Sequence, residues 1–161
     1  MIDQPDGMYL AELNVARARY EIYDRAMSGF VRRLDTVNAL AEASKGFVWR
    51  YKSDESSGPD MVSLDGDPRL IVNLSVWESS EDLEHFVWNT VHRQVYQKRK
   101  QWFSDLGRPH FVMWYVKPDA MPTIDESAAK LAYLTEHGPS AEAFGWESLP
   151  NLKKWQEAQC A

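Results

Sequence analysis

Cysteine is nearly absent: the chain has a single cysteine, Cys160, as the second-last of its 161 residues. One thiol cannot form an intrachain disulfide, and it excludes a metal site built from several cysteines. The sequence also lacks an apolar run long enough to cross a membrane, and its first ten residues, MIDQPDGMYL, are acidic and contain no apolar signal core. From these absences we expect a cytoplasmic protein.

Positive charge is also in deficit, since 18 Lys and Arg against 24 Asp and Glu give a formal net charge of −6. This balance argues against nucleic acid and anionic membrane as main partners. The one basic cluster, residues 93–100, contains interleaved apolar residues and is typical of a solvated helix face.

Motifs for metal, nucleotide and hydrolase sites are missing as well. The four histidines do not have the spacing of H-x-x-x-H or H-E-x-x-H, so metal binding has little support. There is no Gly-rich phosphate-binding loop and no G-x-S-x-G, so no motif supports a nucleotide-binding or serine-hydrolase function.

Aromatic residues, in contrast, are plentiful: they form 12% of the chain and include seven Trp and seven Tyr. So much indole fits either the aromatic walls of a pocket or interface, or a Trp-rich core. The length fits one domain, 1–161, with its core over about 8–117 and a C-terminal helix and arm over 118–161.

The stretch 69–106 organises the chain, and it begins with a predicted strand over 70–77. Because strand side chains alternate between two faces, one face is aliphatic and the other carries Asn73, Ser75 and Trp77. We expect a helix on the aliphatic face, and we predict that the mixed face is a pocket wall. There Asn73 and Trp77 could hold a developing oxyanion, with the indole stacked on a flat substrate. Alternatively, Asn73 and Ser75 satisfy each other or a water in a structural barrel.

A helix is predicted over 80–106, started by a capping box at Ser79 and broken near Asn89-Thr90. A polar and aromatic stripe runs along it at helical spacing: His85, Trp88, His92, Tyr96 and Arg99. His92 is the best acid–base candidate because its unperturbed pKa lies near neutrality, although a structural histidine at a helix break is equally compatible. The other histidines are expected to be solvent-facing or structural, namely His85, His110 and His137.

Further residues could line the same pocket. Trp49 and Trp114 lie on predicted neighbouring strands and would complete an aromatic box, or pack in the core. Asn14, at the end of the first strand, would line the mouth. Arg99 and Arg17 could bind a carboxylate, phosphate or phenolate, but each also fits a surface ion pair.

The remaining elements predict the fold class. Strands are predicted over 8–14, 47–51 and 110–116, helices over 27–43 and 123–136, and a long loop, rich in Ser, Asp, Gly and Pro, over 52–68 that is a candidate lid or interface arm. The order βαββαβ with a C-terminal helix is that of an α+β, ferredoxin-like fold with a four-stranded antiparallel sheet and both crossover helices on one face. We expect the mixed face to be left bare and to be covered by a second copy, which gives a homodimer with one pocket in each half.

Several segments together resemble domain-of-unknown-function family 3291, of the dimeric α/β-barrel superfamily: LAELNVAR (10–17), FVRRLDTVNALAEASKGFVWR (30–50), VNLSVWES (72–79), QWFSDLGRPHFVMWYV (101–116), MPTIDE (121–126) and LTEHGPSAEAFGW (134–146). The resemblance covers about residues 8–146 and implies the barrel fold. Within the wider superfamily, which this chain resembles mainly at Val76–Ser79, are cofactor-independent monooxygenases, muconolactone-isomerase-like enzymes, polyketide cyclases and haem proteins.

The resemblance implies a small-molecule enzyme that carries out cofactor-independent oxygenation, isomerisation or cyclisation of a planar or polyketide-like substrate. Two alternatives stay open. One is a haem-binding barrel with His92 as axial ligand, and the other is a non-catalytic small-molecule binding protein that uses the same pocket.

Overall fold

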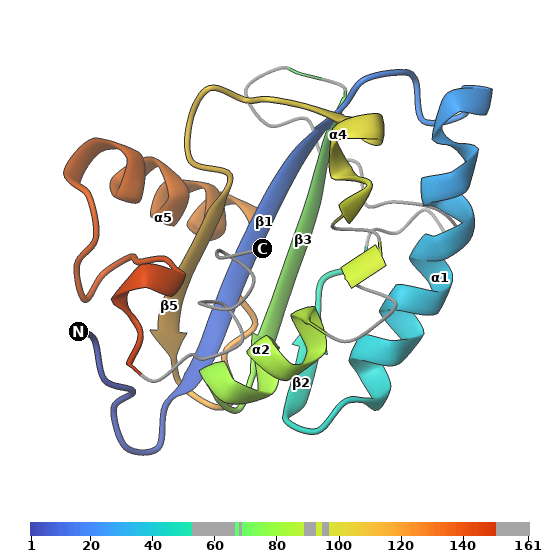
Figure 1. The fold of residues 1–161 in the computed structure, drawn as a ribbon. Coiled ribbons are helices and arrows are strands. Elements are labelled where there is room, and N and C mark those ends of the chain that lie inside the picture. The colour runs from blue at the N-terminus through green and yellow to red at the C-terminus, as the bar shows by residue number, and fades with distance from the viewer. Residues whose placement is uncertain (53–66, 68, 89–92, 95–96, 151–161) are drawn as a thin grey trace.

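The computed structural model describes residues 1–52, 67, 69–88, 93–94 and 97–150 (Figure 1). The strands are β1 (Tyr9–Ala18), β2 (Phe47–Arg50), β3 (Leu70–Trp77), β4 (Phe103–Ser104) and β5 (Phe111–Val116). The helices are α1 (Ser28–Ala43), α2 (Ser80–Val87), α4 (Arg99–Trp102) and α5 (Ile124–His137), with short 3-10 helices η1 (Arg25–Met27) and η2 (Trp146–Ser148).

The strands form one antiparallel sheet in which β1 and β3 lie side by side at the centre (Figure 1). β2 pairs with the outer edge of β3, and β5 pairs with residues 9–14 of β1 on its other edge. The two-residue strand β4 pairs with residues 17–18 of β1, so β4 and β5 share one position in the sheet. The predicted α+β ferredoxin-like fold is therefore confirmed, with its fourth strand divided into two pieces.

Two element boundaries differ from prediction by more than one residue. β1 continues four residues past Asn14, because Val15 and Ala18 are buried and residues up to Arg17 pair with β3. The helix predicted over 80–106 ends as α2 at Val87. Among its described later residues, Arg93, Gln94 and Gln97 are also helical, and α4 and then β4 follow. The predicted break at Asn89-Thr90 lies outside the described residues.

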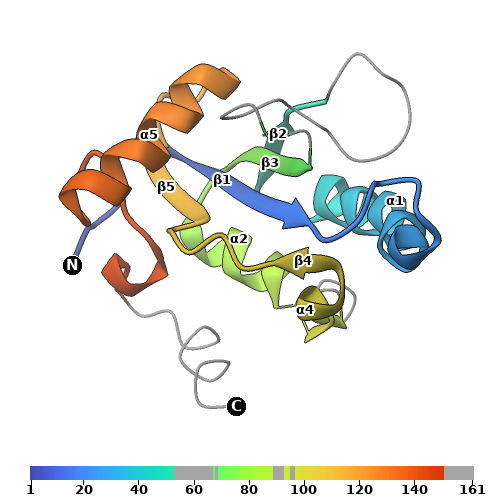
Figure 2. The same cartoon turned by 90° about the horizontal axis from the view of Figure 1, so that it is seen from above.

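The prediction of a bare mixed face is wrong for the part that carries Ser75 and Trp77, which are buried, whereas Asn73 is exposed. Side chains of α1 and α2 pack on the face that carries Trp77, in a core made of Leu10, Val37, Ala41, Trp77, Leu83, Phe86, Met113, Phe144 and Leu149. The aliphatic face packs against α5, whose Leu131 and Leu134 join Leu13, Val72, Leu74 and Val76. Figure 2 shows α5 on one side of the sheet and α2 and α4 on the other.

The physical reason is that β1 and β5 supply the mixed face with large apolar side chains, Leu10 and Met113, on either side of the polar ones. Alternation within one strand cannot reveal this contribution from its neighbours. Because helices already cover this part of the sheet, no second copy is needed to bury it. The homodimer stays a prediction.

The start of α2 is held against the turn between α1 and β2. Gly46 has φ +82°, its carbonyl oxygen accepts from the backbone N–H of Glu78 at 2.7 Å, and a Cβ at this position would overlap the carboxylate of Asp82. The Ser79 hydroxyl accepts from the Asp82 backbone N–H at 3.2 Å, so the predicted N-cap is confirmed.

Gly46→Ala is therefore expected to lower the free energy of unfolding by about 2–4 kcal/mol, from the positive φ together with the displaced Asp82. Gly107→Ala is the matched control: its φ is also positive, at +65°, but nothing lies within 4 Å of its added Cβ. Urea denaturation of the two variants measures the difference, and equal losses would contradict the close approach of Gly46 to α2.

None of the helices in the described residues is long and apolar enough to span a membrane.

Candidate functional site

A buried chain of hydrogen bonds crosses the two central strands. Glu12 on β1 and Ser75 on β3 are direct partners in the strand register, and Trp77 lies two residues further along the same face. The Ser75 hydroxyl donates to Glu12 Oε1 at 2.5 Å, and Trp77 Nε1–H donates to Ser75 Oγ at 2.9 Å. Relative exposure is only 5% for Glu12, 5% for Ser75 and 1% for Trp77. The chain thus runs from the Trp77 N–H through the Ser75 hydroxyl to one buried carboxyl group.

The carboxyl group of Glu12 holds its proton at neutral pH. Burial raises its pKa from the ordinary value of 4.5 to about 8, and the hydrogen bond from Ser75 opposes this only partly. Within the described residues, Ser75 is the one hydrogen-bond partner of this side chain. A carboxyl group that titrates near pH 8 can both accept and release protons under ordinary conditions.

The Trp77 ring is fixed by its neighbours. It stacks on Phe86 of α2, with ring centroids 5.2 Å apart and an interplanar angle of 22°. Phe47 of β2 meets it edge-on at 5.5 Å and 84°. This packing orients the indole N–H toward Ser75, so Trp77 serves the hydrogen-bond chain as a positioning group.

Two exposed amides lie next to the buried chain. Asn14 and Asn73 are direct partners on β1 and β3, on the same face as Glu12 and Ser75 and two residues along each strand. That separation is about 6.8 Å along a strand. Both side chains are exposed, and no described group forms a hydrogen bond with either amide. The face is therefore open to solvent beside Glu12, where two amides can donate to a ligand oxygen.

The structure brings together four of the predicted site residues, namely Asn14, Asn73, Ser75 and Trp77. Trp49 and Trp114 lie in the core on the opposite face of the sheet, so they do not form a box with Trp77. Trp88 is half-buried at the C-terminal end of α2. Arg17 forms an ion pair with Asp67 at 2.7 Å, as the surface alternative predicted, and Arg99 is exposed on α4. His92 and Tyr96 lie outside the described residues.

The remaining histidines lie away from the buried chain. His85 is exposed on α2, and His137 ends α5 beside Glu136 at 3.8 Å. Partial burial, together with the charge of Arg99, lowers the pKa of His110, although the charge of Asp105 opposes the shift. In the portion of the chain that the structure describes, no cluster of three or more His, Cys, Asp or Glu could hold a metal ion.

Glu12 is a candidate site residue that the sequence analysis did not single out. Its strand, YLAELNVARA, reads as an ordinary half-buried strand, and Glu12 looks like a solvent-facing residue in it. The available signal was that Glu12 shares a face with Leu10, so a carboxylate stands directly beside a core residue. Its pairing with Ser75 could not be read from the sequence, because 63 residues separate them.

Residues 9–160 of the chain match the protein family DUF3291, a domain of unknown function. No curated protein matches the chain.

Solved structures give only distant similarities. A conserved protein from Methanosarcina mazei Go1 has a TM-score of 0.46 at 8% identity, over 69% of this chain and 93% of that one. A "Putative antibiotic biosynthesis monooxygenase from Nitrosomonas europaea" has a TM-score of 0.42 at 11% identity, over 71% and 91% of the two chains. A chain with the same description from Chloroflexus aurantiacus J-10-fl has a TM-score of 0.40 at 14% identity, over 72% and 98%.

Proposed function

The chain belongs to the DUF3291 family, and from its buried Glu12–Ser75–Trp77 chain we propose that it is an enzyme that transfers protons on a small organic molecule. The observation that carries the proposal is a carboxyl group with a pKa of about 8 beside two exposed amides. General acid–base groups work best when their pKa lies near the operating pH.

In the proposed reaction, ionised Glu12 takes a proton from a carbon next to a carbonyl group. The C–H bond breaks, its electron pair moves onto the carbonyl oxygen, and an enolate forms while Glu12 becomes neutral. The amides of Asn14 and Asn73 donate to the enolate oxygen. Return of the proton to a different carbon gives an isomer. Alternatively, the enolate carbon attacks a second carbonyl group and closes a ring: a C–C bond forms, the C=O π bond breaks, and its oxygen takes the proton from Glu12.

Ser75 and Trp77 act as positioning residues in this scheme. Ser75 donates to the carboxylate and keeps its orientation, and the Trp77 N–H keeps the Ser75 hydroxyl turned toward Glu12. In this scheme the base is Glu12. His92 lies outside the described residues, and its role as an acid–base residue stays a prediction.

Glu12→Gln is expected to abolish turnover, with a loss of at least about 100-fold, because the amide cannot take a proton. The protein is incubated in heavy water with a metabolite extract, and mass spectrometry identifies compounds that gain deuterium or are converted with the wild type but not with the variant. For a compound found in this way, kcat/KM of the wild type should rise about tenfold per pH unit up to about pH 8 and then level off, because only ionised Glu12 is the base.

Glu12→Gln keeps the size of the side chain and an oxygen for the Ser75 hydrogen bond, so this variant also controls for structural damage. Equal conversion of the same compound by wild type and Glu12→Gln would reject the proposal. Tight retention of a compound by both proteins without any conversion would favour the non-catalytic binding function instead.

A further inference from the structure

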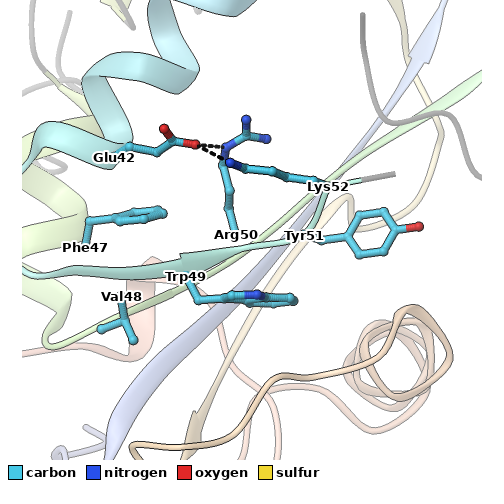
Figure 3. Close-up of a pocket in the computed structure, with 7 residues that line it drawn as sticks. All are labelled: Glu42, Phe47, Val48, Trp49, Arg50, Tyr51 and Lys52. Carbon is cyan, nitrogen blue, oxygen red and sulfur yellow. Dashed lines mark hydrogen bonds and ion pairs between the residues drawn. The ribbon is translucent and has the colours of Figure 1, made fainter. Parts of the chain in front are cut away.

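The strand β2 adds positive charge to the face that carries Glu12. Arg50 is the register partner of Ser75, so it lies on that face one strand away from the buried chain. Figure 3 shows Arg50 and Lys52 turned toward Glu42 of α1, whereas Trp49 points to the other side of the strand. Two cations thus stand between α1 and the sheet.

Lys52 extends the row of exposed amides. The backbone N–H of Tyr51 donates to the carbonyl of Leu74 at 2.8 Å, which continues the pairing of β2 with β3 past Arg50. Lys52 therefore follows at the level of Asn73, on the same side of the sheet. With neighbouring strands about 4.8 Å apart, Lys52, Asn73 and Asn14 form a row about 10 Å across, next to Glu12.

Glu42 of α1 holds the side chains of Arg50 and Lys52 in place. Its Oε1 accepts from Arg50 Nε at 2.8 Å and lies 3.1 Å from Lys52 Nζ. The hydrogen bonds from Arg50 and then Lys52 lower the pKa of Glu42, so it stays ionised and keeps both cations on this side. The Lys52 side chain is 62% exposed, and an ammonium group has three donors, so a ligand can still bind to it.

There is also room for a ligand beside Lys52, along the outer strand β2. A hollow of about 530 Å³ runs along β2, lined by Glu42, Phe47, Val48, Trp49, Arg50, Tyr51 and Lys52 (Figure 3). On the side of Lys52 this lining includes the ring of Phe47, whereas Trp49 and Tyr51 point to the other side of the strand (Figure 3), so the ammonium group and one aromatic ring are available to a molecule that bears an acidic group.

We propose that Lys52, together with Asn73, binds the acidic group of the substrate, so that the molecule acted on at Glu12 is an organic anion with a carboxylate, sulfonate or phenolate oxygen. This inference rests on the proposed function for the reaction, but the binding itself can be measured without turnover. The ligand spans from Lys52 to Glu12. Its carbonyl oxygen lies at Asn14 and at the second N–H of Asn73, since a side-chain amide has two donors.

A matched pair of fluorescent probes tests the inference: 8-anilinonaphthalene-1-sulfonate, and N-phenyl-1-naphthylamine, which has the same rings without the sulfonate. Lys52→Met is expected to raise the Kd of the anionic probe by about tenfold at low ionic strength and to leave that of the neutral probe within about twofold. Lys52→Arg should keep the wild-type preference, and Asn73→Ala should weaken the anionic probe only. Lys117→Met, which removes an exposed lysine at the far end of β5, is the control and should change neither.

Equal affinity of the wild type for both probes, or equal effects of Lys52→Met and Lys117→Met, would overturn the inference. The outcome is separable from that of the proposed function. Glu12→Gln is expected to keep the preference for the anionic probe while it loses turnover. If the variant loses turnover but the wild type binds both probes equally, only the anion site is rejected.

Discussion

Glu12→Gln is expected to unfold at higher urea concentration than the wild type at pH 8.5, although the two proteins have similar stability at pH 4.5. The folded-state pKa of Glu12, about 8, lies above its ordinary value of 4.5. Between these values the folded protein binds more protons than the unfolded chain, so wild-type stability falls as the pH rises, by about 1.4 kcal/mol per pH unit from this group. Over the whole window the loss is on the order of 5 kcal/mol.

The variant removes this dependence, because glutamine is neutral at every pH in the window and its oxygen can still accept from Ser75. Urea denaturation at several pH values between 4.5 and 8.5 measures the free energy of unfolding of both proteins. Glu136→Gln is the control, since the Glu136 side chain is 76% exposed and its removal should leave the wild-type pH dependence. Parallel pH curves for wild type and Glu12→Gln would show that Glu12 is ionised in the folded protein, against the argument from burial.

Trp77→Ala is the second large effect, with an expected loss of about 3–5 kcal/mol in the free energy of unfolding. The ring is 1% exposed and lies between Phe86 and Phe47, so its removal leaves a cavity between the sheet and α2. Trp77→Phe keeps an aromatic ring there but loses the N–H that donates to Ser75, and we expect it to cost about 1–2 kcal/mol.

Thermal and urea unfolding of the two variants separate packing from hydrogen bonding at this position. Trp77→Phe should also raise the pKa of Glu12, because a Ser75 hydroxyl that has lost its own donor is a weaker donor to the carboxylate. If Trp77→Ala and Trp77→Phe unfolded at the same urea concentration, the indole would not be the packing centre between β3 and α2 that the structure describes.

Local signals in the sequence predicted the main elements well. The two-residue alternation over 70–77 matches β3, the apolar spacing over 27–43 matches α1, and the box formed by Thr123 and Glu126 starts α5 as predicted. Such signals depend on neighbours within about four residues, so they can be recognised from the local sequence alone. The element order then leaves few topologies, and the ferredoxin-like arrangement was among them.

The candidate site was predictable only in part. Ser75 and Trp77 share a face because of the strand period, so their grouping was found, but the partner that gives them a chemical role, Glu12, comes from a strand 63 residues away. The same is true of the register that sets Lys52 beside Asn73. Pairing between distant strands depends on the packing of the whole sheet, and one strand read alone does not contain it.

The sequence by itself determined that this protein is an α+β chain with a central strand of alternating aliphatic and polar-aromatic faces, because backbone period and helix capping are local properties. Only the tertiary structure decided which face the crossover helices cover, and with it the chemical character of Glu12. A carboxyl group keeps its ordinary pKa in water and changes it when neighbouring elements exclude the solvent, and that exclusion here is the joint effect of β1, β3 and the helices packed on them.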